Sequence, residues 1–249
     1  MSGIQEGHYY QRQFDCSCSV IAWSHSSRFK VALQLLGDKP QKVLDYGCGD
    51  GTFLAMAADR IQQGKGVDVS SYMINSCKTR LADIPNVSFA KVDELDPADE
   101  QSFDVVTCME TLEHCLEPSI DIVLKDLARL VSPQGKVIIS VPIEIGPTFF
   151  FKQVIRWIAG VTSLPEYRDY EVYPLKDALR MVFANHQTKF ERPIYTNSDE
   201  PYYPHYGFNW RAMRKSVEQY LVVEKTSFSP LGFLGGWFSS QVWFICRKP

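Results

Sequence analysis

The stretch Val43–Phe53, VLDYGCGDGTF, decides the fold. A short apolar run ends in Asp45, the glycines Gly47, Gly49 and Gly51 follow at alternate positions, and a helix-compatible run comes next. Glycine permits positive φ and has no Cβ, so a ligand can lie against the backbone, and the helix that follows offers free N–H groups and a positive dipole end. The order predicts a strand, a tight glycine loop and a helix, with a small polar ligand at the loop.

Spacing separates the common kinds of glycine loop. The phosphate-binding pattern GxxxxGK[ST] is absent, and the dinucleotide pattern GxGxxG would need its third glycine at position 52, which is Thr52. The remaining pattern, hydrophobic-Asp-x-Gly-x-Gly-x-Gly, resembles the first motif of the class I S-adenosylmethionine (SAM) dependent methyltransferases. The resemblance implies that Asp45, Gly47, Cys48, Gly49 and Gly51 contact SAM. A plain glycine turn is the alternative, which the neighbouring motifs disfavour.

Length and composition favour one soluble α/β domain over residues 1–249. The formal net charge of −3 gives no general attraction to nucleic acid or to an anionic membrane. The seven cysteines are scattered, and the closest pair, Cys16 and Cys18, lacks the CxxC spacing of zinc or redox sites. The start has no apolar signal core, and no stretch reaches the roughly 18 apolar residues of a membrane span. We expect reduced thiols and a cytoplasmic location.

The segment 1–37 precedes the core and is expected to be helical in part. Trp23–Leu36 has apolar residues at helical spacing, Ser24 is a candidate N-cap, and Gly37 is a candidate stop. In the methyltransferases that this chain resembles, such a segment often lies over the cofactor cleft. Four side chains of this segment could contact substrate or could simply pack against the protein: His8, Tyr9, Tyr10 and His25. Packing is the simpler interpretation.

A second strand is expected over Gly64–Asp68. It ends in an acid 23 residues after Asp45. An acid about 20 residues past a glycine loop, at the end of the next strand, is placed to accept hydrogen bonds from ribose hydroxyls. We therefore predict Asp68 as the ribose ligand, and we add Val69 and Met73, in the turn and helix that follow, to the cofactor site.

A third strand is expected over Asn86–Lys91, where the sequence alternates. The resemblance implies that an acid just after this strand bonds the adenine amino group. Asp93 takes that position, with Glu94 as the neighbouring alternative. The charged run DELDPADE suits a solvated turn equally well for its other carboxylates.

The second specific signal begins with a fourth strand, Phe103–Cys108, and continues into METLEH at 109–114. FDVV followed by MExLEH matches the strand-four motif of the SAM methyltransferases and, more narrowly, of the ubiquinone-biosynthesis O-methyltransferases. The resemblance places Met109 at the cofactor.

Glu110, Glu113 and His114 are spaced at i, i+3 and i+4, so one helical turn would bring them to one face. They suit general base catalysis on a substrate hydroxyl, for which we name Glu113 and His114, or a divalent metal site. Similar clusters bind a divalent ion in some ubiquinone-pathway enzymes and in small-RNA 3′-end methyltransferases, where a later histidine completes the site. The metal hypothesis is therefore Mg²⁺ held by Glu110, Glu113, His114 and His205. A structural role for His114 is the alternative.

The core is expected to end with a helix at Pro118–Leu130 and a fifth buried strand at Lys136–Val141. Five alternations of strand and helix across 41–142 imply right-handed parallel crossovers, with the ligand at the carboxyl ends of the strands.

The segment 143–205 is too long for a simple loop and is expected to be an insertion with structure of its own. Thr148–Gly160 is apolar and aromatic. It suits an interfacial helix in peripheral contact with a membrane, a lid over the acceptor, or a helix packed on the body. A second inserted helix is expected at Lys176–His186. Several tyrosines of this region offer aromatic surface to an acceptor.

The tail, 206–249, is expected to add a helix at Trp210–Tyr220 and strands at Leu221–Phe228 and Gln241–Arg247. The resemblance then implies a Rossmann-like, doubly wound seven-stranded sheet of order 3-2-1-4-5-7-6 with its last strand antiparallel.

The function that the resemblance implies is SAM-dependent transfer of a methyl group to a small-molecule acceptor at oxygen. A glycan or an RNA end is the alternative acceptor, and a non-catalytic SAM-binding subunit is the alternative class.

Overall fold

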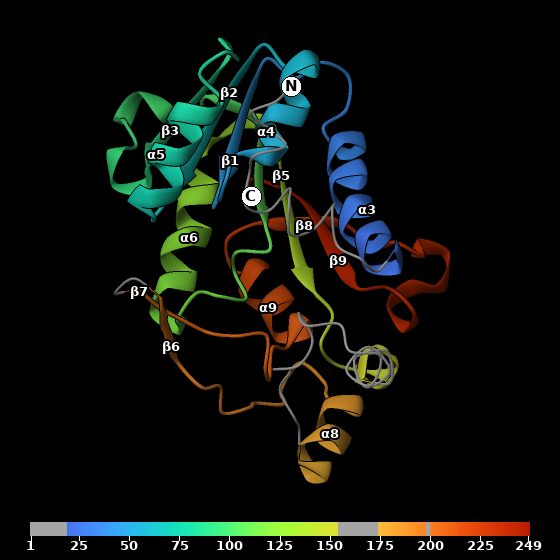
Figure 1. The fold of residues 1–249 in the computed structure, drawn as a ribbon. Helices are drawn as coiled ribbons and strands as arrows, with labels where there is room; N and C mark the ends of the chain where they lie inside the picture. The colour runs from blue at the N-terminus through green and yellow to red at the C-terminus, as the bar shows by residue number, and fades with distance from the viewer. Residues whose placement is uncertain (1–18, 154–173, 198–199) are drawn as a thin grey trace.

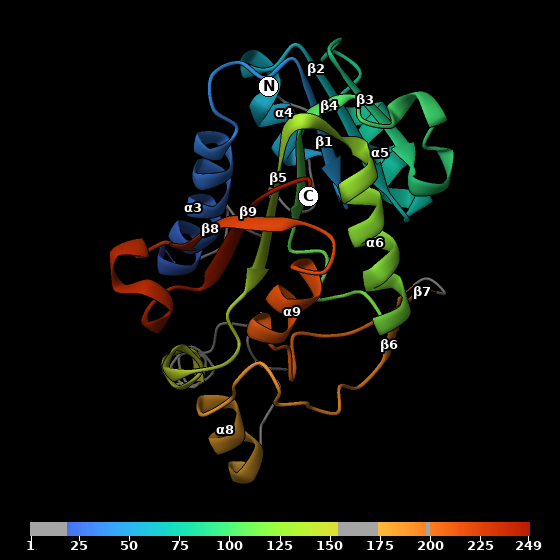
Figure 2. The same cartoon turned by 180° about the vertical axis from the view of Figure 1, so that it is seen from behind.

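The protein is a seven-stranded mixed sheet covered by helices on both faces (Figures 1 and 2). The computed structural model describes residues 19–153, 174–197 and 200–249. The sheet order is β3-β2-β1-β4-β5-β9-β8, and β9 runs antiparallel to both of its neighbours. The predicted order and the antiparallel last strand are confirmed. The strands are β1 Lys42–Tyr46, β2 Gln63–Asp68, β3 Val87–Lys91, β4 Phe103–Met109, β5 Val131–Pro142, β8 Val222–Ser229 and β9 Gln241–Arg247.

The helices divide between the two faces of the sheet, except α8, which packs within the insertion. One hydrophobic cluster contains residues of α3, α4 and α5, and the other contains residues of α6 and α9. Neighbours on β1 alternate between them: Val43 belongs to the first cluster and Leu44 to the second, as the period of a strand requires. Each fully buried aliphatic side chain contributes about 1.5–3 kcal/mol. The helices are α3 Ser19–Leu35, α4 Thr52–Ala57, α5 Ser71–Arg80, α6 Glu117–Leu130, α8 Leu175–Val182 and α9 Trp210–Val217.

Short 3₁₀ turns fill several of the connections. They are η1 Ala58–Arg60, η2 Val92–Glu94, η3 Pro97–Asp99 and η5 Gly232–Trp237. The helix expected after the glycine loop is short, because α4 ends at Ala57 and η1 carries the chain on toward β2.

Several predicted helix and strand ends differ from the structure. The helix α3 begins at Ser19, so Ser24 lies inside the helix and the cap assignment was wrong. The strand β5 begins at Val131 rather than Lys136, because Val131 already pairs with Phe103 and the intervening residues form an irregularity before Lys136 pairs with Val105.

The helix α8 ends at Val182, short of the predicted His186. Beyond it the chain turns back, and the Asn185 side chain accepts hydrogen bonds from Gln187 N–H and from the Thr188 hydroxyl. These local side-chain bonds compete with continuation of the helix.

The insertion has a small core of its own. Ile145, Phe149, Met181 and Ala184 pack together, and Gly146 N–H donates to Met181 O at 2.9 Å. Residues 147–153 are helical. A two-stranded hairpin, β6 Tyr195–Asn197 with β7 Glu200–Tyr202, was not predicted.

Some predicted contacts fall outside the description of the structure. His8, Tyr9 and Tyr10 lie outside the described residues, as does the second half of the apolar segment 148–160, and the side chain of His25 is not described. Within 19–153, 174–197 and 200–249, no helix combines the length and the apolar character that crossing a membrane requires.

Candidate functional site

The glycine loop follows β1 and reaches the start of α4. Gly47, Gly49 and Gly51 have φ of +76°, +53° and +73°. A Cβ built on Gly47 would lie 2.3 Å from Oγ1 of Thr111. Gly47 N–H donates to Val67 O at 2.8 Å, which holds the loop against β2. The glycines are therefore required by backbone conformation and, at Gly47, by the approach of the loop after β4.

Asp68 joins the end of β2 to this loop. Its Oδ2 accepts a hydrogen bond from Gly49 N–H at 2.9 Å, and its Oδ1 accepts one from Ser70 N–H at 2.9 Å. A carboxylate has about four acceptor sites, so both oxygens can accept further hydrogen bonds from a ligand. The predicted ribose ligand is thus fixed beside the predicted SAM loop.

Asp45 lies beneath the loop with only 2% of its surface exposed. Its Oδ1 accepts a hydrogen bond from the Thr107 hydroxyl at 2.7 Å. Burial raises the pKa of Asp45 to about 7, and the charge of Asp68 adds to the rise, while the Thr107 bond and the charge of Arg28 oppose it. This carboxyl is a buried polar support for the loop.

Cys48 is buried within the loop. The Cys77 thiol raises its pKa through a hydrogen bond, and burial adds to the rise, so Cys48 is held as a neutral thiol. Cys77, on α5, also donates to Gly49 O at 3.3 Å. The two thiols pack the loop against α5.

The residues predicted to surround adenine lie nearer the surface. The Asp93 side chain is 69% exposed and pairs with Lys91 at 2.8 Å, which lowers its pKa. Glu94 accepts a hydrogen bond from Lys91 N–H at 3.0 Å. Val69 is 60% exposed, and both methionines assigned to the cofactor, Met73 and Met109, are partly buried. These assignments stay predictions.

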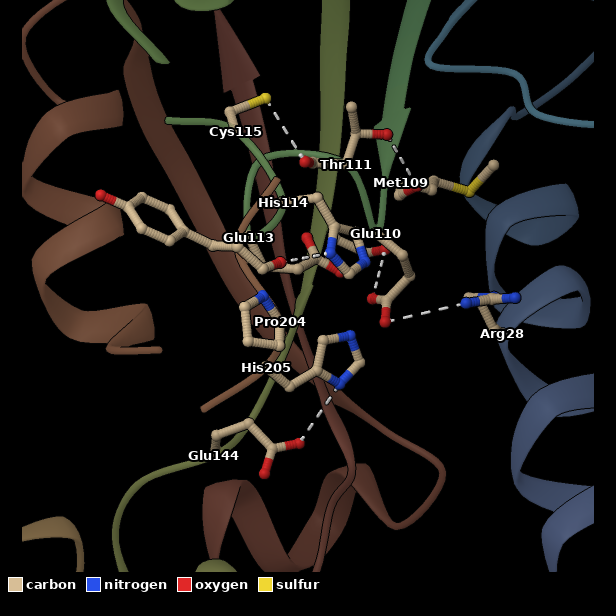
Figure 3. A network of polar contacts seen from close by, with 12 residues as sticks. Arg28, Met109, Glu110, Thr111, Glu113, His114, Cys115, Glu144, Pro204 and His205 are labelled. Atoms are coloured by element: carbon tan, nitrogen blue, oxygen red, sulfur yellow. Dashed lines mark hydrogen bonds and ion pairs between the residues drawn. The ribbon is translucent and has the colours of Figure 1, made fainter. Parts of the chain in front are cut away.

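Arg28 is a site residue that the sequence analysis missed. It lies on α3 with 8% of its surface exposed, and one of its terminal nitrogens lies 3.7 Å from Glu110 Oε2 (Figure 3). Its charge also lowers the pKa of Asp45 and of Glu113. The only signal in the sequence was the position of this cation on the helix. Arg28 is next to Phe29 and four residues before Ala32, and both of these residues are buried.

The METLEH segment is not helical at Glu110. Glu110 has φ +52°, and its Oε1 accepts a hydrogen bond from the Ser140 hydroxyl at 3.1 Å. The chain then turns so that His114 N–H bonds to Thr111 O at 3.0 Å. Glu110 therefore has Arg28 and Ser140 as partners, while Glu113 and His114 meet a different segment.

Glu113 is fully buried, and neither of its carboxyl oxygens has a hydrogen-bond partner among the described residues. Burial raises its pKa well above its usual range, with a further contribution from Glu110 and opposition from Arg28 and Arg192. A buried carboxyl without a partner is costly, so it is a strong indication of a ligand at this position.

His114 and His205 complete the group around Glu113 (Figure 3). His114 Nδ1 lies 2.8 Å from Tyr203 O, and its Nε2 lies 4.0 Å from Glu113 Oε1. Burial lowers the pKa of His114. The ring of His205 lies 5.1 Å from that of His114, and one ligand atom each of Glu113, His114 and His205 lie within 4.8 Å of one another. Glu110 is not part of this group.

Arg192 ties the insertion to the METLEH segment and was missed in the sequence. One terminal nitrogen donates to Glu113 O and to Pro204 O, at 2.6 Å each, and Nε donates to Tyr206 O at 3.0 Å. Its guanidinium also lies 4.4 Å from the ring centre of Tyr203. The segment that carries His205 is thereby held beside Glu113.

In the described part of the predicted membrane-contact segment, some aromatic side chains are buried and others are exposed. Phe149 is buried, whereas Phe150 is 60% exposed. Phe151 stacks on Phe238 with ring centres 4.7 Å apart, and the Thr148 hydroxyl donates to Gly236 O. The helical residues 147–153 thus adjoin η5, which exposes Phe233, Leu234 and Trp237.

Comparison with known proteins finds a family match within the core of the chain. Residues 43–135 match a family described as a methyltransferase domain. The match covers β1 to the start of β5, including the glycine loop, and the sheet order agrees with a methyltransferase domain at these residues.

Among curated proteins, the chain is similar to the ubiquinone biosynthesis O-methyltransferase of Neisseria meningitidis serogroup A, with 33% identity over 105 residues. That match covers 40% of this chain and 43% of the relative, so the chain spans less than half the length of the curated protein that it matches.

Two solved structures share the fold over nearly the whole chain. The PH0226 protein of Pyrococcus horikoshii OT3 has a TM-score of 0.63 and 15% identity, over 97% of this chain and 98% of that one. Magnesium protoporphyrin IX methyltransferase of Synechocystis, solved with bound S-adenosylhomocysteine (SAH), has a TM-score of 0.55 and 14% identity, over 96% and 93%. At these identities the likeness concerns the fold alone.

Proposed function

We propose that this chain catalyses SAM-dependent transfer of a methyl group to an oxygen of a small-molecule acceptor. The observation that carries the proposal is the adjacency of two groups at the carboxyl ends of neighbouring strands. The glycine loop and Asp68 follow β1 and β2, and Glu113 and His114 follow β4. In open α/β sheets, ligands bind in the crevice at this edge.

The cofactor site would use the loop Gly47–Gly51 and Asp68. The ribose hydroxyls would bond to Asp68, with adenine toward Asp93. Arg28 suits the carboxylate of the methionyl part, because a guanidinium binds carboxylates well and this one lies among acidic groups beside the loop. The SAM relationship is supported by the family match and by the SAH-bound fold relative.

The chain's own residues have to align an acceptor and accept its proton. When bound, SAM supplies a methyl group already activated by its sulfonium. His114 is suited to take the hydroxyl proton on Nε2: its lowered pKa keeps the ring neutral at pH 7, and Nδ1–H donates to Tyr203 O. Glu113, whose raised pKa favours the protonated form, would hydrogen-bond the acceptor.

A divalent metal ion is the second candidate for the same group, because three potential ligands converge and one of them is a buried carboxyl without a partner among the described residues. Two imidazoles and one carboxylate suit Mn²⁺ or Zn²⁺ better than Mg²⁺, which prefers oxygen ligands. Glu110 would join only by leaving Arg28 and Ser140. The ion would lower the pKa of an acceptor hydroxyl and orient it.

The insertion is proposed to hold the acceptor. The name of the Neisseria relative supports a small molecule and an oxygen atom. Peripheral membrane contact through 148–160 is supported by exposed Phe150 and Phe151, and a cytoplasmic location by the free thiols of the described cysteines. A glycan, an RNA end or a non-catalytic role are the alternatives that turnover measurements separate.

The test begins with SAM binding by calorimetry. Asp68→Ala removes the proposed ribose ligand and should weaken SAM binding by about 100-fold or more, since hydrogen bonds to a charged group contribute about 1.5–3 kcal/mol each. Asp83→Ala, an exposed acid beyond α5, is the matched control. Unchanged affinity in a folded Asp68→Ala protein would refute the cofactor assignment.

A screen of phenolic, quinol, glycan and RNA acceptors with labelled SAM then tests turnover. Methylation of phenols or quinols would support the proposed acceptor class. Label found only in glycan or RNA, or SAM binding without turnover on any of them, would favour the corresponding alternative.

A further inference from the structure

Glu144 lies just after β5 and touches two residues of the insertion. It is 1% exposed, and its Oε1 lies 2.8 Å from Lys152 Nζ and 3.8 Å from His205 Nδ1. Because β5 pairs with β4, this carboxylate reaches the same edge of the sheet as Glu113 (Figure 3). No motif in the sequence pointed to Glu144.

In both histidines of the group, Nδ1 faces an oxygen atom of another residue. For His114 this is the backbone carbonyl oxygen of Tyr203, at 2.8 Å. For His205 it is the carboxylate of Glu144. A carbonyl and an ionised carboxylate can only accept, so in a neutral ring each favours the proton on Nδ1 and leaves the lone pair on Nε2.

We propose that Glu144 is a positioning residue that holds His205 in the Nδ1–H tautomer, so that its Nε2 lone pair is available to the group formed with Glu113 and His114. This inference rests on the proposed function of that group in accepting a proton or holding a metal ion. Outer carboxylates commonly fix the tautomer and orientation of a ligating histidine in this way.

Lys152 explains how a buried carboxylate is tolerated at this position. Its ammonium pairs with Glu144 at 2.8 Å and thereby offsets the cost of burying one charge. The separation of 3.8 Å between Glu144 and His205 exceeds a hydrogen bond, so the carboxylate acts on the ring through its electrostatic potential. The pair also links the helical residues 147–153 to the group.

The test is a long-range ¹H–¹⁵N NMR spectrum of the full chain, labelled with ¹⁵N, at about pH 8.5, where ordinary histidines are neutral. Protonated and unprotonated ring nitrogens have distinct ¹⁵N shifts, and His205→Gln assigns the signal. The decisive variant is Glu144→Met with Lys152→Met, which removes both charges and leaves neither ion unpaired. Asp177→Asn is the matched control, because this insertion acid pairs with Arg180 at 3.4 Å.

The wild type and Asp177→Asn should show His205 as the Nδ1–H tautomer. The double variant should shift the ratio severalfold toward Nε2–H, because the electrostatic potential of the carboxylate at Nδ1 is lost. The His114 signal should stay constant throughout. An unchanged His205 ratio in the folded double variant, or an Nε2–H signal in the wild type, would overturn the inference. Should the double variant not fold, Glu144→Gln should give a smaller shift in the same direction, and an unshifted ratio would count against Glu144.

A titration of the wild type with Mn²⁺ alone separates this inference from the metal hypothesis. If the wild type binds Mn²⁺, the double variant should bind it about 10–100-fold more weakly. If the wild type binds no Mn²⁺, the metal hypothesis for Glu113, His114 and His205 fails, and the tautomer measurement alone decides the role of Glu144.

Discussion

Gly47→Ala should destabilise the protein through one identifiable contact. Gly47 has φ +76°, and a Cβ there would lie 2.3 Å from Oγ1 and 2.6 Å from Cγ2 of Thr111. Thr111 follows Glu110 in the METLEH segment and donates to Met109 O at 3.1 Å. The added methyl group would therefore force the glycine loop away from the METLEH segment, which carries the proposed base.

The magnitude follows from two costs. A left-handed conformation costs a residue with a Cβ about 1–2 kcal/mol. Overpacking adds about 1–3 kcal/mol. The sum for Gly47→Ala is about 2–5 kcal/mol. Thr111→Ala removes both clashing atoms together with one hydrogen bond worth about 1 kcal/mol. In the double variant most of the packing cost should disappear, since only Cβ of residue 111 stays close, at 3.0 Å. This gives a favourable coupling of up to about 1–3 kcal/mol.

Urea unfolding followed by circular dichroism measures all three variants. Gly146→Ala is the matched control, because Gly146 has φ +84° and a Cβ there would meet no atom within 4 Å. It should lose only the conformational cost of about 1–2 kcal/mol.

The reasoning would be refuted if Gly47→Ala and Gly146→Ala were equally destabilised. It would also be refuted if the changes at Gly47 and Thr111 were simply additive. Either result would mean that the loop and the METLEH segment do not press on each other.

Three further predictions concern charge and metal. Burial raises the pKa of Asp45 from 3.8 to about 7, so the protonated carboxyl stabilises the fold fully below pH 3.8 and this stabilisation is lost as the pH rises through about 7. In thermal unfolding without SAM, the wild type should therefore lose stability from pH 5 to 8 relative to Asp45→Asn. Arg28→Met should weaken SAM about tenfold or more yet leave methylthioadenosine, which lacks the carboxylate, unaffected in calorimetry, and equal losses for both would contradict the assignment. If Glu113, His114 and His205 hold an ion, EDTA should abolish methyl transfer and Mn²⁺ restore it, whereas activity indifferent to the chelator would leave His114 acting alone as the base.

Much of the sheet could be predicted because its signals are local. The apolar run before Asp45 and the acid at Asp68 mark the ends of β1 and β2, and the parallel topology then brings those ends together. The last strand, Gln241–Arg247, has the bounds predicted from its apolar run. Each of these signals lies within one short stretch.

The remainder of the site depends on contacts between distant segments. Arg28, Glu144 and Arg192 come from a helix, a strand end and an insertion, and their partners are far away in the chain. No periodicity encodes such pairings. The positive φ of Glu110 also escaped prediction, since residues other than glycine adopt that conformation only uncommonly.

The contact between His114 and Tyr203 sets a rule for exchanging acceptor segments between relatives. The backbone of each residue bonds the other: Tyr203 N–H donates to His114 O at 3.0 Å, and His114 Nδ1 meets Tyr203 O. A transplanted insertion that omits Tyr203 would also release the imidazole. Chimaeras joined on the amino-terminal side of Arg192 would keep the bond from Arg192 to Glu113 O and the contact between His114 and Tyr203. The part of the insertion before Arg192 could then be exchanged to vary specificity while the proposed base stays in place.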